Sequence, residues 1–240
     1  KEKMLAPDGR LLRRYRDGEA ALPAYLDDYA CLVWGLLELY RATFNAAHLK
    51  WAVLLNESML ELFRGQGEAL QFAGIDRNEE LPAYTDAYDG AIPSGNSVAA
   101  LNLLKLGRLT GRQDWWERGE AIIRAFSGDL QGSPPAFTFM VAALDFALGP
   151  AAELVIAGEP GSAEVEKMAA AVRRSFHPHT VLLFHPAGPG KEEIEALAPF
   201  IEPMTALPGG AGAYLCRDRS CLPPVTDTAA LEALLKEQKL

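Results

Sequence analysis

The sequence predicts a mainly helical fold that is followed by a smaller α/β part. The first observation is the apolar spacing i, i+3, i+4, i+7, which is typical of amphipathic helices and recurs between residues 29 and 148. The second is an internal repeat within that region. The third is a change of pattern after Gly149-Pro150, where short and fully apolar runs typical of buried strands begin.

The chain is expected to open with a short β-hairpin, because Leu11, Leu12 and Tyr15 lie between two Asp-Gly or Gly-containing turn signals. A strand-like run at residues 69–73 and an irregular stretch at residues 74–95 interrupt the helices that follow. Helices are expected at residues 29–40, 47–63, 96–109, 113–127 and 135–148.

The repeat relates two of these helices. Residues 36–43 (LLELYRAT) recur as residues 103–110 (LLKLGRLT), an offset of 67 from Leu36 to Leu103, with five of the eight positions identical. Each copy forms a hairpin with the helix after it. A single hairpin cannot bury its apolar face alone, so we expect stacked hairpins in a solenoid or an α/α toroid. The third unit, residues 137–148, shows one helix only, which indicates an incomplete array.

The α/β part shows a strand at residues 154–157, a helix around residues 165–172 and a strand at residues 180–184. Two apolar strands joined by a helix are the βαβ signature of a small parallel sheet. A helix near residues 191–198, a strand at residues 213–216 and a last helix from Asp227 complete the chain. These patterns predict a helical-hairpin domain at residues 1–150 and a small α/β subdomain at residues 151–240.

Composition excludes several classes of protein. The 240 residues are 49% hydrophobic, which indicates a folded globular chain. With 23 basic and 32 acidic residues the net charge is −9, which argues against nucleic acid as a partner. No apolar run is long enough for a membrane span, and no targeting signal is visible. Because there are only three cysteines, a cytoplasmic location is expected.

Candidate site residues lie in the two loops that precede the repeated helices. Equivalent loops of stacked hairpins lie at the same end of the array, so these residues are expected to share a rim. Carboxylates beside aromatic rings suit sugar binding, and a carboxylate pair suits general acid/base catalysis. Helix capping and turn formation are the alternative. The predicted catalytic residues are Asp28, Asp86 and Asp89, and the predicted substrate-binding residues are Tyr25, Asp27, Tyr88, Ser94 and Asn96.

Cys216 and Cys221 form a second candidate site, for redox chemistry, in which Arg217 and Arg219 would favour the thiolate. The spacing allows a local disulfide or half a zinc site, while buried inert thiols are the alternative. Gly158 and Gly161 lie in a plain βα turn without a nucleotide-binding pattern.

The histidines are expected at strand ends. His177 and His179 share strand parity, but neither has a third metal ligand nearby in sequence. Neither a metal nor a cofactor is therefore expected.

Several segments together resemble a known family: residues 27–30 (DDYA), 86–90 (DAYDG), 93–97 (PSGNS), 214–221 with its two cysteines, and 224–227 (PVTD). In this order they resemble the C-terminal half of the YyaL / spermatogenesis-associated protein 20 family, over nearly the whole chain. The resemblance implies a thioredoxin-fold domain followed by an α/α toroid, similar to N-acylglucosamine 2-epimerases and six-hairpin glycosidases. It also implies that the thioredoxin-like part and the first toroid hairpins are missing here. Such epimerases use toroid histidines, but the helical part offers only His48, so their chemistry does not carry over.

Three functions remain open on the sequence. The leading hypothesis is a carbohydrate- or polyol-binding part of a toroid protein, with an epimerase, isomerase or glycosidase-like activity that uses the loop carboxylates. The second is a thiol-redox protein that acts through Cys216 and Cys221 with a thioredoxin-like domain outside this chain. The third is a non-enzymatic interaction scaffold. The expected partners are thus a sugar-like small molecule and the missing N-terminal part, without nucleic acid or membrane.

Overall fold

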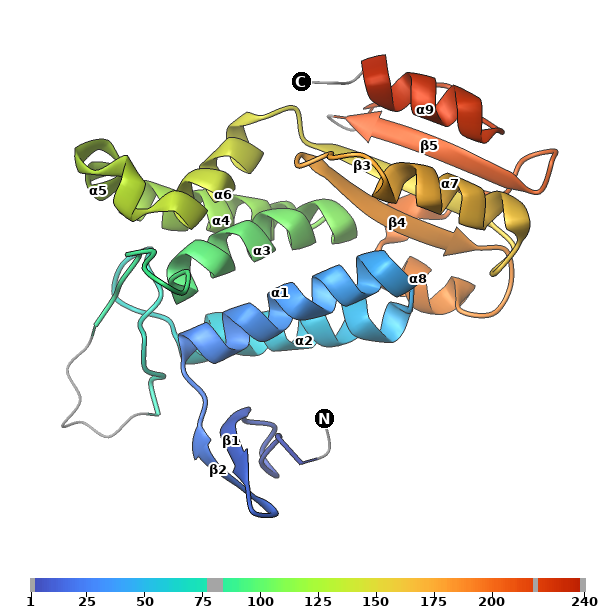
Figure 1. Ribbon diagram of the computed structural model, residues 1–240. Coiled ribbons are helices and arrows are strands. Elements are labelled where there is room, and N and C mark those ends of the chain that lie inside the picture. The colour runs from blue at the N-terminus through green and yellow to red at the C-terminus, as the bar shows by residue number, and fades with distance from the viewer. Residues whose placement is uncertain (1–2, 77–83, 218–219, 238–240) are drawn as a thin grey trace.

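The computed structural model describes residues 3–76, 84–217 and 220–237. It confirms the fold class: the protein is rich in α-helix and carries a small four-stranded sheet in its second part (Figure 1). Among the described residues, none of the helices has the length and apolar character needed to cross a bilayer.

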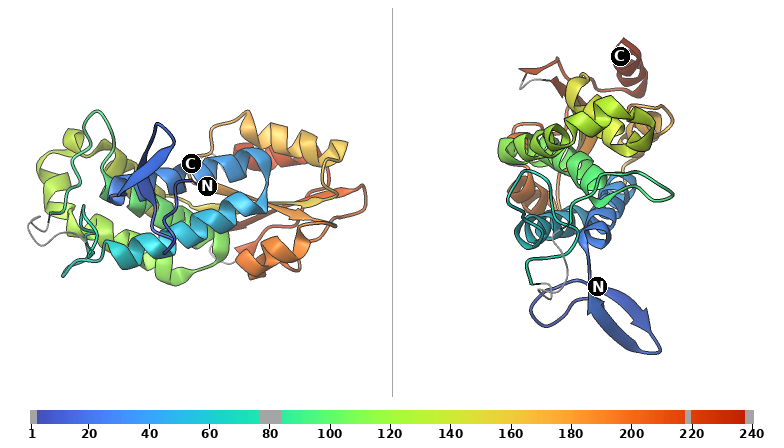
Figure 2. Two further views of the ribbon diagram at one scale, coloured as in Figure 1. Left: turned by 90° about the horizontal axis from the view of Figure 1, so that it is seen from below. Right: turned by 90° about the vertical axis from the view of Figure 1, so that its left-hand side faces the viewer.

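The N-terminal hairpin is confirmed and projects from the helical body (Figure 2). It consists of β1 (Leu12–Arg16) and β2 (Glu19–Pro23), which pair antiparallel. The buried guanidinium of Arg10 fastens its base: Nη2 donates to the Ala24 carbonyl at 3.1 Å and lies 3.2 Å from Asp76 Oδ1. The hairpin is thereby held at the start of the first helix.

The helical array packs in a regular series. α1 lies against α2 and α3, and α3 lies against α4 and α6. Residues 69–73 do not form the expected strand, because their backbone groups bond to scattered partners: Leu70 to the Asn96 side chain, and Phe72 to the Tyr84 carbonyl. The helices are α1 (Leu26–Thr43), α2 (Ala46–Leu62), α3 (Gly95–Thr110), α4 (Gln113–Ala125), α5 (Ser127–Gly132) and α6 (Thr138–Leu148).

The internal repeat corresponds to α1 and α3, which lie side by side in the same direction. Lys105 Nζ approaches Glu38 Oε1 at 3.4 Å, and these two residues occupy equivalent positions of the repeat, 67 residues apart. Asn102 Nδ2 donates to the Ala30 carbonyl at 2.8 Å further along the same pair of helices. The stacking of hairpins is therefore as expected, and closure into a toroid stays a prediction.

The α/β part contains the expected βαβ unit, but its sheet is mixed rather than parallel. β3 (Ala152–Gly158), α7 (Ala163–Arg173) and β4 (Thr180–Pro186) form the unit, with β3 and β4 parallel. The next strand, β5 (Ala211–Arg217), runs antiparallel to β3. β5 begins at the carboxyl end of the sheet, where Ala211 lies opposite Gly158, and runs back along β3. The remaining elements of this part are α8 (Lys191–Leu197), the 3-10 helix η2 (Pro199–Ile201), β6 (Ser220–Cys221) and α9 (Thr228–Glu237).

Both faces of this sheet are covered. Leu154 and Ile156 face α7 and α9 and belong to a cluster with Met168 and Leu231. Val155, between them in sequence, belongs instead to the cluster formed by the helical array. The Tyr40 hydroxyl on α1 accepts a hydrogen bond from the Phe184 N–H on β4 at 3.2 Å. The apolar core is thus continuous across residue 150, where the architecture changes.

Candidate functional site

A pocket of about 610 Å³ lies where the N-terminal ends of α1 and α3 meet the base of the hairpin. Six of the predicted site residues line it: Asp27, Asp28, Asp86, Tyr88, Ser94 and Asn96. The lining residues that the sequence did not predict include Arg13, Cys31, Trp51 and Tyr84. The register of the repeat therefore brought the two loops together at one end of the array.

Asp27 joins the two repeated helices at the pocket. Its carboxylate accepts a hydrogen bond from the Gly95 N–H, at the first turn of α3. Burial raises the pKa of Asp27, the Gly95 N–H opposes that change, and the neighbouring charge of Asp28 adds to it. Asp27 is thus a half-buried carboxyl group that takes up a proton more readily than a free aspartate.

Gly95 is required for this approach of α1 to α3. A Cβ atom at this position would overlap Asp27 Oδ1 and would lie 2.7 Å from the Cγ of Leu26. Any larger residue would force the N-terminal ends of the two helices apart. The offset of 67 residues makes Asp28 the equivalent of Gly95 in the first copy of the repeat. Unlike Asp27, Asp28 contacts Tyr25 and Arg13.

Asp28 and Arg13 form the side of the pocket next to the hairpin. Asp28 Oδ2 accepts a hydrogen bond from the Tyr25 N–H at 2.9 Å, and Arg13 Nε lies 3.8 Å from the same oxygen. The Arg13 guanidinium lies 5.1 Å from the centre of the Tyr25 ring, which in turn stacks on Phe72 at 4.7 Å. Tyr25 does not line the pocket; it supports the residues that do.

Asp86 lines the pocket from the second loop, and in the sequence it lies between the exposed residues Tyr84 and Tyr88. Its Oδ1 accepts a hydrogen bond from the Tyr88 N–H at 2.9 Å. The charge of Asp86 and a hydrogen bond to its carboxylate raise the pKa of Tyr84, whose hydroxyl is the donor. The Tyr84 and Tyr88 residues are 54% and 59% exposed, so their rings are accessible to a ligand.

Asn96 and Ser94 hold the pocket wall in place. The buried Asn96 side chain accepts from the Leu70 N–H at 2.8 Å and donates to the Leu70 and Asp86 carbonyls, both at 2.9 Å. Ser94 caps α3, because its Oγ accepts from the Ser97 N–H at 3.1 Å. These contacts match the capping and loop-structure alternative for both residues, although both also border the pocket.

Asp89 lies outside the pocket lining. Its Oδ2 accepts hydrogen bonds from the Phe139 and Met140 N–H groups at 2.7 and 3.0 Å, at the start of α6. Its Oδ1 accepts from the Ser94 N–H at 2.9 Å. Both oxygens are thus engaged by backbone groups, as the capping alternative describes, and Asp89 connects α6 to the start of α3.

Cys31 and Trp51 also add chemistry to the pocket. Cys31 lies four residues after Asp27 on α1, and this spacing on one helix face was the available signal. Burial raises the pKa of the Cys31 thiol, and the nearby charges of Asp27 and Asp28 add to the effect. Trp51 reaches the pocket from α2, and no local pattern marked it.

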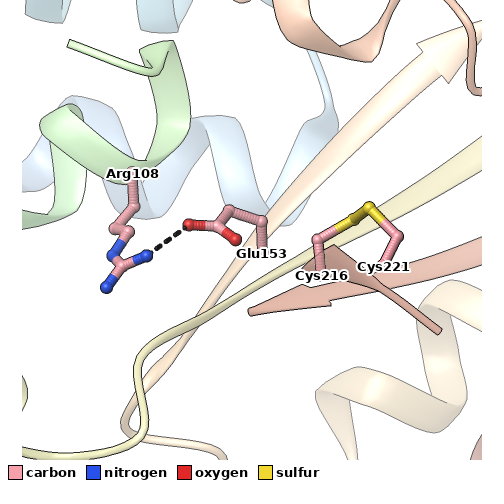
Figure 3. Close-up of a disulfide and its surroundings, with 4 residues drawn as sticks. All are labelled: Arg108, Glu153, Cys216 and Cys221. Carbon is pink, nitrogen blue, oxygen red and sulfur yellow. Dashed lines mark hydrogen bonds and ion pairs between the residues drawn. A yellow bond between two sulfur atoms is a disulfide. The ribbon is translucent and has the colours of Figure 1, made fainter. Parts of the chain in front are cut away.

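The second candidate site contains a disulfide between Cys216 on β5 and Cys221 on β6 (Figure 3). Cys216 is buried and Cys221 is exposed. Because the two cysteines form a disulfide, the alternative of two buried, inert thiols does not describe this pair. Glu153 is the register partner of Cys216 on β3, and its Oε1 lies 3.0 Å from Arg108 Nη1. Arg219 lies outside the described residues.

The histidines occupy separate places. His177 and His179 precede β4 rather than belonging to it, so the expected strand parity does not apply. His179 Nε2 lies 2.8 Å from Asp145 Oδ2, and the buried His185 lies between the Met204 carbonyl and Glu195. Within the described ranges, no three His, Cys, Asp or Glu side chains are grouped to hold a metal ion.

Comparison with known proteins gives relatives but no family model that matches the chain. The chain is 34% identical to human spermatogenesis-associated protein 20 over 213 residues, which is 88% of this chain and 27% of the relative. The rat protein of the same name is 32% identical over 89% of this chain. An uncharacterized protein of Caenorhabditis elegans is 27% identical over 92% of this chain and 30% of its own length. The chain therefore spans about a quarter of the length of these relatives.

Proposed function

This chain is homologous to spermatogenesis-associated protein 20, a name that specifies no substrate, and from that premise we propose a function on the pocket itself. The pocket binds a carbohydrate or a similar polyol. One observation carries the proposal: the carboxylates of Asp27 and Asp86 and the rings of Trp51 and Tyr88 line the same pocket. Carboxylate oxygens accept hydrogen bonds from ligand hydroxyl groups, and aromatic faces pack against the C–H faces of a sugar ring.

The size of the pocket supports a ligand of this kind. Small-molecule sites commonly have volumes of roughly 300–1,000 Å³ and combine apolar walls with a few polar groups. The pocket of about 610 Å³ lies within that range and has Phe72 and Ile92 among its apolar residues. One disaccharide or a sugar with an aglycone matches this volume better than a single small ion.

Asp27 is the residue best suited to move a proton in this pocket. Burial raises its pKa toward the pH at which a carboxyl group serves as a general acid. Asp28 is held by Arg13 and the Tyr25 N–H, which suits it to orient a ligand. An epimerase, isomerase or glycosidase-like reaction at this site would therefore use Asp27 for acid/base catalysis, with Asp86 as the second carboxylate.

A ligand screen tests the proposal directly. The full chain is titrated with monosaccharides, sugar alcohols and disaccharides, and binding is measured by saturation-transfer NMR and calorimetry. Asp86→Asn and Tyr88→Ala should each weaken a bound sugar at least about tenfold, since the first removes the carboxylate charge and the second removes an exposed aromatic face of the pocket. Asp129→Asn is the matched control, because Asp129 is exposed on α5, away from the pocket. If the same sugar binds all four proteins equally, the pocket is not its site.

The disulfide supports thiol-redox exchange as a second candidate function. An incoming thiolate attacks the sulfur of Cys221, the more exposed residue of the pair, the Cys216 thiolate leaves, and a second thiol of the donor then resolves the mixed disulfide. The donor dithiol is oxidised and Cys216 and Cys221 become two thiols. Reduction by a thioredoxin and its reductase, followed as NADPH consumption and thiol counting, tests this. A pair that stays oxidised while a control disulfide substrate is reduced removes this candidate.

A further inference from the structure

α6 differs from α1 and α3 because, in the part of the chain that the structure describes, no helix follows it as a hairpin partner. α2 follows α1 and packs against it, and α4 follows α3 in the same way. After α6 the chain instead passes into β3, which starts at Ala152. α5 and α6 lie at the edge of the array farthest from α2 (Figures 1 and 2). Among the described helices, none occupies the position on α6 that α4 occupies on α3.

A groove of about 500 Å³ marks this position, between α4, α5 and α6. On α6 it is lined by Val141, Leu144 and Leu148, which share one helix face at the spacing i, i+3, i+7. Val141 is 38% exposed and Leu148 is 79% exposed. Ile123 of α4 and Leu130 of α5 form the opposite wall. A helix with solvent on this face would normally carry polar residues there.

The corresponding face of α3 shows what such a surface binds. A Cβ at Gly119 of α4 would lie 2.9 Å from Leu104 Cγ and 3.0 Å from the Ala100 carbonyl oxygen, so α4 packs closely on this face. A Cβ at Gly107 of α3 would lie 3.0 Å from the Trp116 backbone nitrogen. On α3 the face formed by Ala100, Leu104 and Gly107 is thus covered by a helix. On α6, Val141 and Leu148 border the groove and are exposed.

We infer that the groove between α4, α5 and α6 is the binding site of an amphipathic helix from polypeptide outside these 240 residues. The helix packs antiparallel to α6, as α4 packs on α3, and completes the third hairpin. Glu120 and Arg124 of α4 border the groove and supply one charge of each sign for the polar flank of that helix. The human relative matches this chain over 27% of its length, so most of its polypeptide is available to supply such a segment.

Synthetic peptides test this inference on the intact 240-residue chain. Peptides of about 20 residues, longer than the 17 of α2, cover the part of the human relative that this chain does not match. Binding is measured by fluorescence anisotropy, and helix formation on binding by circular dichroism. One contiguous set of peptides should bind and become helical. Leu148→Asp should weaken that binding at least about tenfold, because it places a charge in an apolar contact.

Phe176→Asp is the matched control, since Phe176 is an apolar residue 87% exposed in the loop before β4. It should bind the peptides like the unmodified chain. Leu148→Asp should keep the unmodified far-UV spectrum and melting temperature, because the side chain is exposed. Three results would overturn the inference: no peptide binds, the peptides bind Leu148→Asp equally, or light scattering shows a dimer of the chain that Leu148→Asp dissociates.

Discussion

Replacement of Gly95 by alanine tests how α1 and α3 are joined at the pocket. The added Cβ would overlap Asp27 Oδ1 and approach Leu26 Cγ and Cδ2 at 2.7 and 3.0 Å. Leu26 is fully buried, so it has little freedom to move away. Overpacking of this kind costs about 1–3 kcal/mol. The better helix propensity of alanine returns at most about 1 kcal/mol, less in a first turn. We expect a net loss of about 1–2 kcal/mol in the free energy of unfolding.

Urea unfolding followed by circular dichroism measures this loss, with Gly35→Ala as the control. Gly35 lies within α1 and a Cβ there meets no atom within 4 Å. It should therefore stabilise the chain by up to about 1 kcal/mol through helix propensity. If Gly95→Ala is as stable as Gly35→Ala, the close approach of the two helices is not as described. Repeating Gly95→Ala in an Asp27→Ala background should reduce the penalty, since one overlapping atom is then gone.

Three further predictions concern the same region. Asn96→Ala should lower the free energy of unfolding by about 2–4 kcal/mol, because it leaves the Leu70 and Asp86 backbone groups unpaired; a urea midpoint equal to the unmodified chain would contradict this. Burial raises the pKa of Asp27 in the folded state, so the folded chain binds this proton more tightly than the unfolded chain does. The free energy of unfolding should therefore fall as the pH rises from the ordinary pKa of 3.8 through the raised pKa of the folded state. Asp27→Asn should remove this pH dependence. If the urea midpoints of Asp27→Asn and of the unmodified chain change with pH in the same way, the prediction is refuted. Alkylation of Cys31 by iodoacetamide should be slow near neutral pH and accelerate only above pH 9.0, because burial raises the pKa of this thiol from its ordinary value of 9.0. Mass spectrometry of the labelled peptide measures the rate, and fast labelling at neutral pH would contradict the prediction.

The sequence predicted the pocket through its repeat rather than through any single residue. An offset of 67 residues relates α1 to α3, and parallel neighbours in register bring Asp27 and Gly95 to the same end. Which of the two consecutive aspartates becomes desolvated was not predictable. That depends on the absence of a side chain at Gly95, one helix away.

Other features depend on partners that lie far off in the chain. Asp89 caps α6, whose first turn begins about 50 residues later, and no local pattern encodes that pairing. Residues 69–73 have the apolar character of a strand, but a side-chain amide from α3 takes the hydrogen bonds of Leu70. The direction of β5 was likewise not encoded in its own periodicity, because parallel and antiparallel strands share a period of two. It is set by where the preceding chain leaves the sheet.

The sheet that lies between the helical array and the pair α7 and α9 has a consequence for biosynthesis. The array leaves the ribosome first, yet its core includes Val155, Leu183 and Cys216, which are made later. One apolar face of the nascent helices therefore stays exposed until β5 has been translated. Truncation of translation between residues 150 and 211 would leave that apolar face uncovered by the sheet.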